Sequence, residues 1–230
     1  MTVHDIADAL PGIDALKDLC RSMAMAEAIL NPDGECIHSY DAQWSETEQA
    51  ASMRNGSGDE YDIVFSPAGA YIRGFDHESP LSPYHREDVP KPWPGMLDSV
   101  PEVFHPYVEE PAFTDENGCP VVTVCLWRET DAPSWETGRI TFPEDHPDPD
   151  GSTWLFEPLL APTPEAFQAF AEDYYEMPTD IEALRRIYAL RPLERRDIVA
   201  LNPSADAERV IAEARAAGYP LAADLRPAAG

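Results

Sequence analysis

The chain has 230 residues, of which 43 are Asp or Glu and 16 are Lys or Arg, so its formal net charge is −27. A surface this acidic repels nucleic acid and anionic membranes at ordinary salt, which argues against both as partners. Hydrophobic residues make up 43% of the chain, enough for a core, and this excludes general disorder.

The N-terminal part, residues 1–34, is predicted to be helical. Ile13, Leu16, Cys20 and Met23 recur at helical spacing within residues 13–30, and turn residues follow at 31–34. The opening MTVHDIADAL lacks the basic start and apolar stretch of a signal peptide, and no apolar run approaches membrane-spanning length. The four cysteines form no CxxC pair. We therefore expect a cytoplasmic protein with reduced thiols.

Residues 35–158 are predicted to be mainly β. Tyr61, Ile63 and Phe65 alternate with other residues at the period of a half-buried strand, and a turn at 66–69 leads to a second alternating run. Five prolines make 76–95 a long loop. A short helix is expected at 101–110, and the predicted strands are 35–42, 49–54, 61–66, 71–75, 120–128, 135–142 and 152–157.

Residues 159–230 are predicted to be helical. Thr163 precedes a proline at a first helical position, Thr179 and Glu182 have capping-box spacing, and Asn202-Pro203 opens a last helix. The expected fold is α+β: a single domain over 1–230, with an antiparallel meander-type sheet of about six strands packed with an N-terminal helix and C-terminal helices.

The polar island Asn55-Gly56-Ser57-Gly58-Asp59 raises the question of a phosphate loop. Such a loop needs a lysine at its end and a helix after it, but here Glu60 and a strand follow. The two glycines instead favour a hairpin turn.

Acidic residues and histidines gather where the meander ends. Asp76-His77-Glu78 enters the proline-rich loop, and His85 follows within it. Three readings stay open for them: a metal site, a binding surface, or an anchor of the loop. No spacing matches a known metal frame, so we assign no metal ligand and expect no cofactor. The candidate binding residues are Asp59, Glu60, Asp76, His77, Glu78 and His85.

Three other features favour structural roles. In HPDPDGSTWLFE, residues 146–157, Asp148, Asp150 and Glu157 fall at calcium-loop positions, but without flanking helices we expect an acidic turn into a strand. Cys119 and Cys125 are expected to be buried and unreactive. The arginines of RRIYALRPLERR, residues 185–196, are expected to pair with the acidic body.

The stretch ASMRNGSGDEYDIVFSPAGAYIRGFDHE, residues 51–78, resembles an uncharacterised bacterial family that shares the pattern ASMR-x-GSGDEY followed by a GFDHE-like end. That resemblance brings no catalytic residue with it. An acidic α+β protein with a meander and C-terminal helices is also similar to the SUKH/SMI1-type immunity proteins of bacterial toxin systems, which implies a protein partner.

The leading functional prediction is a non-catalytic, acidic interaction protein, of which an immunity-type protein is one form, that binds a basic protein partner. The alternative is a metal-dependent hydrolase with a site near His77, Glu78 and His85. A ligand pocket lined by aromatic residues such as Tyr61 and Trp127 is less favoured than a place for them in the core.

Overall fold

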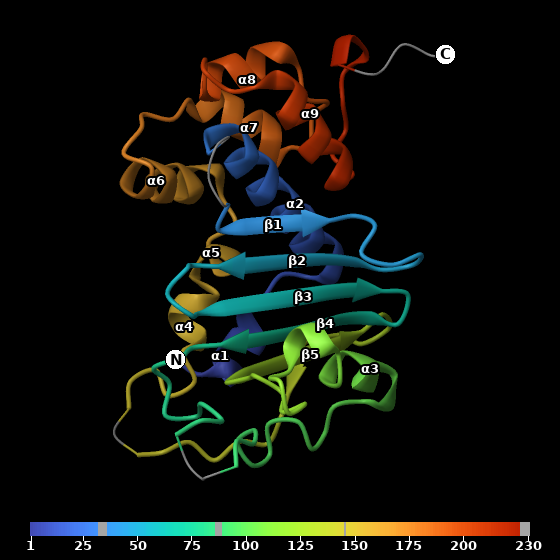
Figure 1. Ribbon diagram of the computed structural model, residues 1–230, viewed down its shortest axis with the longest axis vertical. Coiled ribbons are helices and arrows are strands. Elements are labelled where there is room, and N and C mark those ends of the chain that lie inside the picture. Colours follow the sequence, from blue (N-terminus) through green and yellow to red (C-terminus); the bar gives the residue numbers. More distant parts are fainter. Residues whose placement is uncertain (32–35, 86–88, 145, 226–230) are drawn as a thin grey trace. The chain divides into compact units, whose positions relative to one another are not determined.

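The computed structural model describes residues 1–31, 36–85, 89–144 and 146–225 (Figure 1). Its helices are α1 (Val3–Ala9), α2 (Ile13–Leu30), α3 (His105–Val108), α4 (Ser152–Leu155), α5 (Glu157–Leu160), α6 (Pro164–Tyr174), α7 (Ile181–Tyr188), α8 (Arg195–Leu201) and α9 (Ala207–Ala216). Its strands are β1 (His38–Asp41), β2 (Gln49–Arg54), β3 (Glu60–Ser66), β4 (Gly69–Phe75), β5 (Val124–Glu129) and β6 (Glu136–Thr137).

The strands form a six-stranded sheet in the order β1-β2-β3-β4-β5-β6, with antiparallel pairing from β3 to β6. The predicted α+β class, with an antiparallel meander and helices toward both ends of the chain, is confirmed. The residues group into two compact units, Met1–Ile13 with Ser52–Leu160 and Asp14–Ala51 with Ala161–Gly230. The expectation of one domain stays a prediction.

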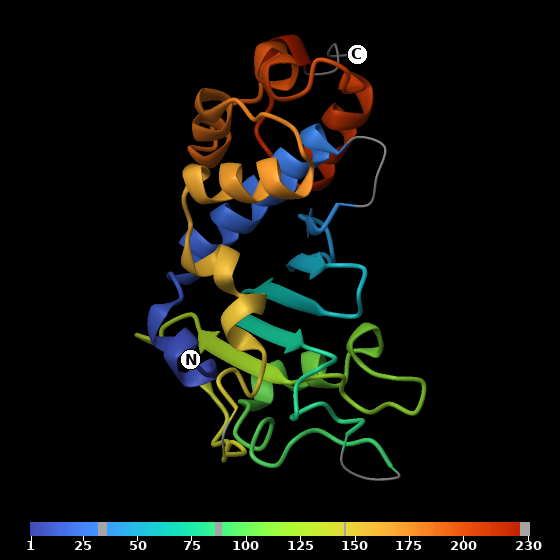
Figure 2. The ribbon, with the colours of Figure 1, turned by 90° about the vertical axis from the view of Figure 1, so that its left-hand side faces the viewer.

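In the first unit, the alternation of β3 and β4 gives the sheet two different faces. Tyr61 lies against Phe156, and Gly74 approaches the same ring so closely that a Cβ there would be 3.1 Å from it. Tyr71, which points to the other face, lies near Phe104. Figure 2 shows α4 and α5 on one side of these strands and the segment with α3 on the other. The apolar core of this unit therefore occupies both faces of the meander.

In the second unit, α2 is buried along most of its length, because its C-terminal half is apolar nearly all round. Asn202 Nδ2 donates to Ile29 O at 3.0 Å, and Ser22 Oγ donates to Ile187 O at 3.3 Å. Glu27 and His38 form a buried pair with 2.6 Å between Oε1 and Nδ1. These bonds join α2 to the C-terminal helices and to β1.

The structure corrects two predicted strands. Residues 152–157 contain the helix α4 and the start of α5, because Gly151 adopts a left-handed φ of 74° and the Asp150 carboxylate accepts from Ser152 N at 3.0 Å, which turns the chain into a helix. Of residues 135–142, only Glu136–Thr137 is a strand. The range 35–158 is therefore less purely β than expected.

The remaining elements follow the sequence with shifted ends. The expected helix at 101–110 is a 3₁₀ turn followed by α3. The described parts of the loop, 76–85 and 89–95, contain no helix or strand, and its residues 86–88 lie outside the described residues. Helix α8 was not predicted. Among the described helices, none is both long and apolar enough to cross a membrane.

Candidate functional site

The polar island is the hairpin turn that the sequence predicts. Asn55 N donates to Asp59 O at 3.3 Å and closes the connection between β2 and β3, while Asn55 Oδ1 accepts from Ser57 N at 2.8 Å. Gly56 and Gly58 have φ values of 76° and 104°, which residues with a Cβ rarely adopt. The turn delivers Asp59 to the beginning of β3.

Asp59 is bound to the residue that follows β4. His77 donates to Asp59 Oδ1 twice, from its backbone N at 2.9 Å and from its ring Nδ1 at 2.6 Å, and Asn55 Nδ2 donates to Oδ2 at 2.7 Å. Burial acts to raise the pKa of the Asp59 carboxyl, but these hydrogen bonds outweigh it and hold the pKa below its usual value. The bond to Asp59 in turn raises the pKa of the His77 imidazole. The geometry favours an ionised Asp59 beside a proton-bearing Nδ1.

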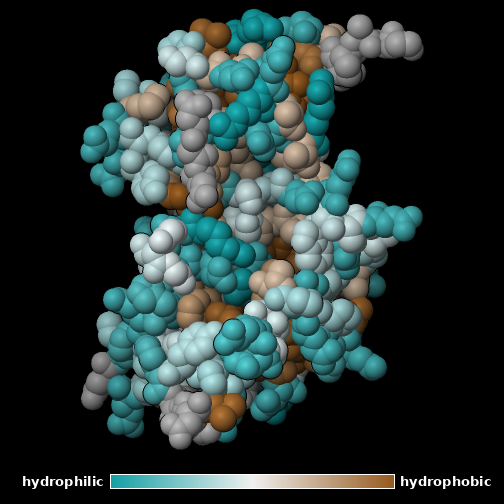
Figure 3. Space-filling model, viewed as in Figure 1, coloured by the Kyte–Doolittle hydropathy of each residue, from teal (hydrophilic) through white to brown (hydrophobic). Residues whose placement is uncertain are grey.

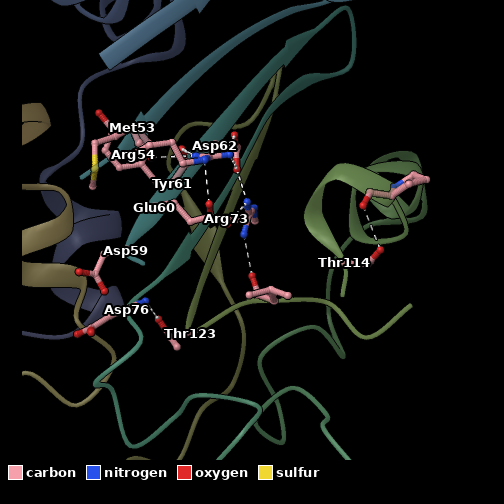
Figure 4. Close-up of polar contacts among 12 residues, drawn as sticks. Met53, Arg54, Asp59, Glu60, Tyr61, Asp62, Arg73, Asp76, Thr114 and Thr123 are labelled. Atoms are coloured by element: carbon pink, nitrogen blue, oxygen red, sulfur yellow. Dashed lines mark hydrogen bonds and ion pairs between the residues drawn. The ribbon is translucent and has the colours of Figure 1, made fainter. Parts of the chain in front are cut away.

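Asp76, the residue before His77, is held from three directions. Its backbone N donates to Thr123 Oγ1 at 3.1 Å, its Oδ1 accepts from Glu78 N at 2.9 Å, and its Oδ2 accepts from Trp154 Nε1 at 3.3 Å. A Cβ at Gly151 would lie 2.3 Å from Asp76 Oδ2, so only glycine leaves room for this carboxylate. Figure 4 shows Asp59 and Asp76 at the same end of the strands.

Among the described residues, Asp59, Asp76 and His77 are the one group of three acidic, histidine or cysteine side chains whose possible ligand atoms all lie within 4.8 Å of one another. We call it the Asp-His cluster. Asp59 and Asp76 are 6% and 8% exposed, whereas the His77 side chain is 45% exposed. The cluster is therefore a buried carboxylate pair with an imidazole at its solvent side.

The other three predicted binding residues lie outside the Asp-His cluster. Glu60 forms ion pairs with Arg54 and Arg73, so its carboxylate is used within the fold. The side chain of Glu78 is 85% exposed, with Oε1 4.0 Å from His77 Nε2. His85 is exposed. The residues of the alternative site, His77, Glu78 and His85, do not form a group of possible metal ligands within the described part of the chain.

The sequence did not reveal the surroundings of the cluster. Trp154 and Gly151 come from a segment more than 70 residues downstream of Asp76, and their part in the site depends on α4. The role of Asn55 could have been predicted from the sequence. An Asn-Gly pair with an aspartate four residues after the asparagine is typical of a turn that side-chain hydrogen bonds stabilise.

Backbone hydrogen bonds hold the acidic loop at 146–157, and of the two cysteines expected to be buried, Cys125 is buried but Cys119 is only half-buried. Asp150 is fully buried and accepts from Val3 N at 2.8 Å as well as from Ser152 N, while Asp148 Oδ1 accepts from Thr153 N at 3.3 Å. All four cysteines are free thiols. Burial raises the pKa of Cys20 and Cys125 to about 12 and that of Cys36 to about 11, so these thiols stay protonated at neutral pH and are poor nucleophiles.

No family model, no curated protein and no solved structure matches this chain.

Proposed function

We propose that the chain is a non-catalytic interaction protein that binds a basic protein partner, as an immunity-type protein binds its toxin. The observation that carries this proposal is that arginine side chains of an already acidic chain are used inside the fold. Arg54 and Arg73 pair with Glu60 and Asp62 on the sheet. The carboxylates in excess over the arginines are therefore left to the surface. Their negative electrostatic field speeds the encounter with a cationic partner.

The arginine-rich segment 185–196 follows the same pattern. Arg185 pairs with Glu165 and Glu182. Arg186 pairs with Glu194 and Asp197, and Arg196 also pairs with Glu194. Internal pairing was predicted for all five arginines of the segment, and it is found for three of them, whose charges are balanced locally. Arg191 and Arg195 form no ion pair with a described residue.

The end of α6 offers a place for a basic side chain. A shallow, largely open hollow is lined by Glu172, Asp173, Glu176, Met177 and Pro178. The three acids are exposed, and Tyr174, in the same segment, is 54% exposed. A carboxylate-lined hollow near an exposed aromatic ring suits a lysine or arginine side chain. Figure 3 shows that most of the viewed face is hydrophilic.

The test starts from capture of proteins from the source cells at about 50 mM and about 500 mM salt, since screening separates charge-driven binding from apolar binding. The captured protein is then purified and its association rate is measured. We expect a basic partner whose association rate falls at least about tenfold between the two salt concentrations. Retention of no basic protein, or a rate independent of salt, contradicts the proposal.

A pair of matched double variants locates the contact. Asp173→Asn with Glu176→Gln removes two negative charges beside the hollow, and Glu129→Gln with Asp131→Asn removes two from exposed positions near the end of β5. We expect the first pair to slow association several-fold more than the second pair. Equal effects of the two pairs indicate that only net charge matters and that the hollow is not the contact.

A further inference from the structure

We propose that the Asp-His cluster of Asp59, Asp76 and His77 binds one first-row divalent metal ion, with Zn²⁺ as the best fit. This inference is independent of the proposed interaction function. The first argument is the donor set. Two carboxylates and one imidazole are ligands that Zn²⁺ takes in proteins, and three protein ligands leave further positions for water. The imidazole disfavours Ca²⁺ and Mg²⁺, which prefer oxygen ligands.

The second argument is charge balance. Asp59 and Asp76 are each more than nine-tenths buried, and the His77 ring pairs with Asp59. Buried carboxylates are usually paired with a cation or coordinate a metal. The His77 ring bonds Asp59, whereas Asp76 accepts from the neutral donors Glu78 N and Trp154 Nε1. A divalent ion between the three side chains would neutralise both carboxylates.

The third argument is distance. In tetrahedral coordination, bonds of about 2.1 Å from Zn²⁺ to nitrogen and oxygen place two ligand atoms about 3.4 Å apart. The three candidate atoms already lie within 4.8 Å of one another, so binding an ion closes the farthest pair by at most about 1.4 Å. The hydrogen bond between His77 Nδ1 and Asp59 Oδ1 would be replaced by a bond from each residue to the ion.

The surroundings hold the carboxylates in place. Asn55 Nδ2 bonds Asp59, while Glu78 N and Trp154 Nε1 bond Asp76, and hydrogen bonds of this kind orient metal ligands in known sites. The ring of His77 at the solvent side provides a route of entry. The competing explanation is that the Asp59–His77 bond only anchors the start of the proline-rich loop.

The test is a calorimetric titration of the full chain with Zn²⁺ in excess Mg²⁺, which occupies the diffuse acidic surface. We expect one Zn²⁺ per chain. His77→Gln, whose side chain is half exposed and so leaves the core intact, should weaken binding at least about tenfold through loss of one ligand. Asp76→Asn should weaken it similarly. His85→Gln, a change in a neighbouring exposed histidine outside the cluster, should leave the affinity unchanged.

A second measurement reports from the site itself. The indole of Trp154 donates to Asp76, so Zn²⁺ should change the tryptophan fluorescence with the same midpoint as the heat, and Trp154→Phe should remove that change. Absence of a stoichiometric Zn²⁺ site overturns the proposal. Equal affinity of the wild-type chain and His77→Gln also overturns it and leaves the loop-anchor explanation.

Discussion

At the scale of single residues, the most constrained charge is Arg73 on β4. Its side chain is 2% exposed, and its guanidinium pairs with Glu60 and Asp62 (Figure 4). The guanidinium also donates to Val121 O at 2.9 Å and lies 4.9 Å from the Phe113 ring centroid. Arg54 pairs with the same two acids but is 42% exposed. The two arginines therefore share partners and differ in burial.

This difference predicts unequal losses of stability. Arg73→Met should lower the free energy of unfolding by about 3 kcal/mol, because it leaves Val121 O without its donor and removes the buried one of the two arginines that compensate Asp62. Arg54→Met should lower it by less than about 1 kcal/mol, since water replaces an exposed guanidinium. Urea denaturation of both variants measures the two losses. Equal losses would show that burial does not determine the strength of this network.

At the scale of elements, α7 shows where sequence reasoning stops. The spacing of Thr179 and Glu182 predicts a capping box, but the N-cap is Asp180, whose side chain accepts from Ala183 N at 2.9 Å. Thr179 is buried, and its hydroxyl donates to Met177 O. Two adjacent residues with capping side chains cannot be separated by propensity alone, because the path of the preceding chain decides between them.

The identity of the cap is testable. Asp180→Ala should lower the free energy of unfolding by about 1 kcal/mol, since it leaves an amide at the start of α7 unsatisfied. Thr179→Val keeps the shape of the side chain and removes only its hydroxyl, so a smaller loss is expected. Urea denaturation compares the two variants. A larger loss of unfolding free energy for Thr179→Val would show that Thr179 is the N-cap, as the sequence predicted.

The strands β3 and β4 were predictable because residue types alternate along their sequences, whereas α4 was not. The run Trp154-Leu155-Phe156 is too short for its periodicity to distinguish a helix from a strand. The helix depends on Gly151 and on the bonds of Asp150, one of which goes to Val3. Asp59, Asp76 and His77 were identified at strand ends, but their convergence required the register of β3 and β4.

At the scale of the whole molecule, the charge of −27 should affect stability through self-repulsion. Raising the salt concentration to about 0.5 M should raise the Tm by about 3 °C at neutral pH, equivalent to ~1 kcal/mol for a chain of this size. Thermal unfolding followed by circular dichroism measures it.

The control for the salt effect is the same experiment near the isoelectric point, about 4.3. Net repulsion vanishes there, so the rise in Tm with salt should vanish too. A salt effect of equal size at both pH values would point to general exclusion of the salt from the protein surface, and not to screening of the acids.

The pairing of Asp62 with Arg73 across β3 and β4 also disfavours a hairpin in which these strands pair in the wrong register. If the two strands slipped by one position, the guanidinium would turn toward the rings and methyl groups around Phe156 and lose its counterions. A shift of two positions toward the turn would set it opposite Val64. In both of these shifted pairings the guanidinium lies opposite apolar side chains, so the pair of Asp62 with Arg73 favours the observed register over them.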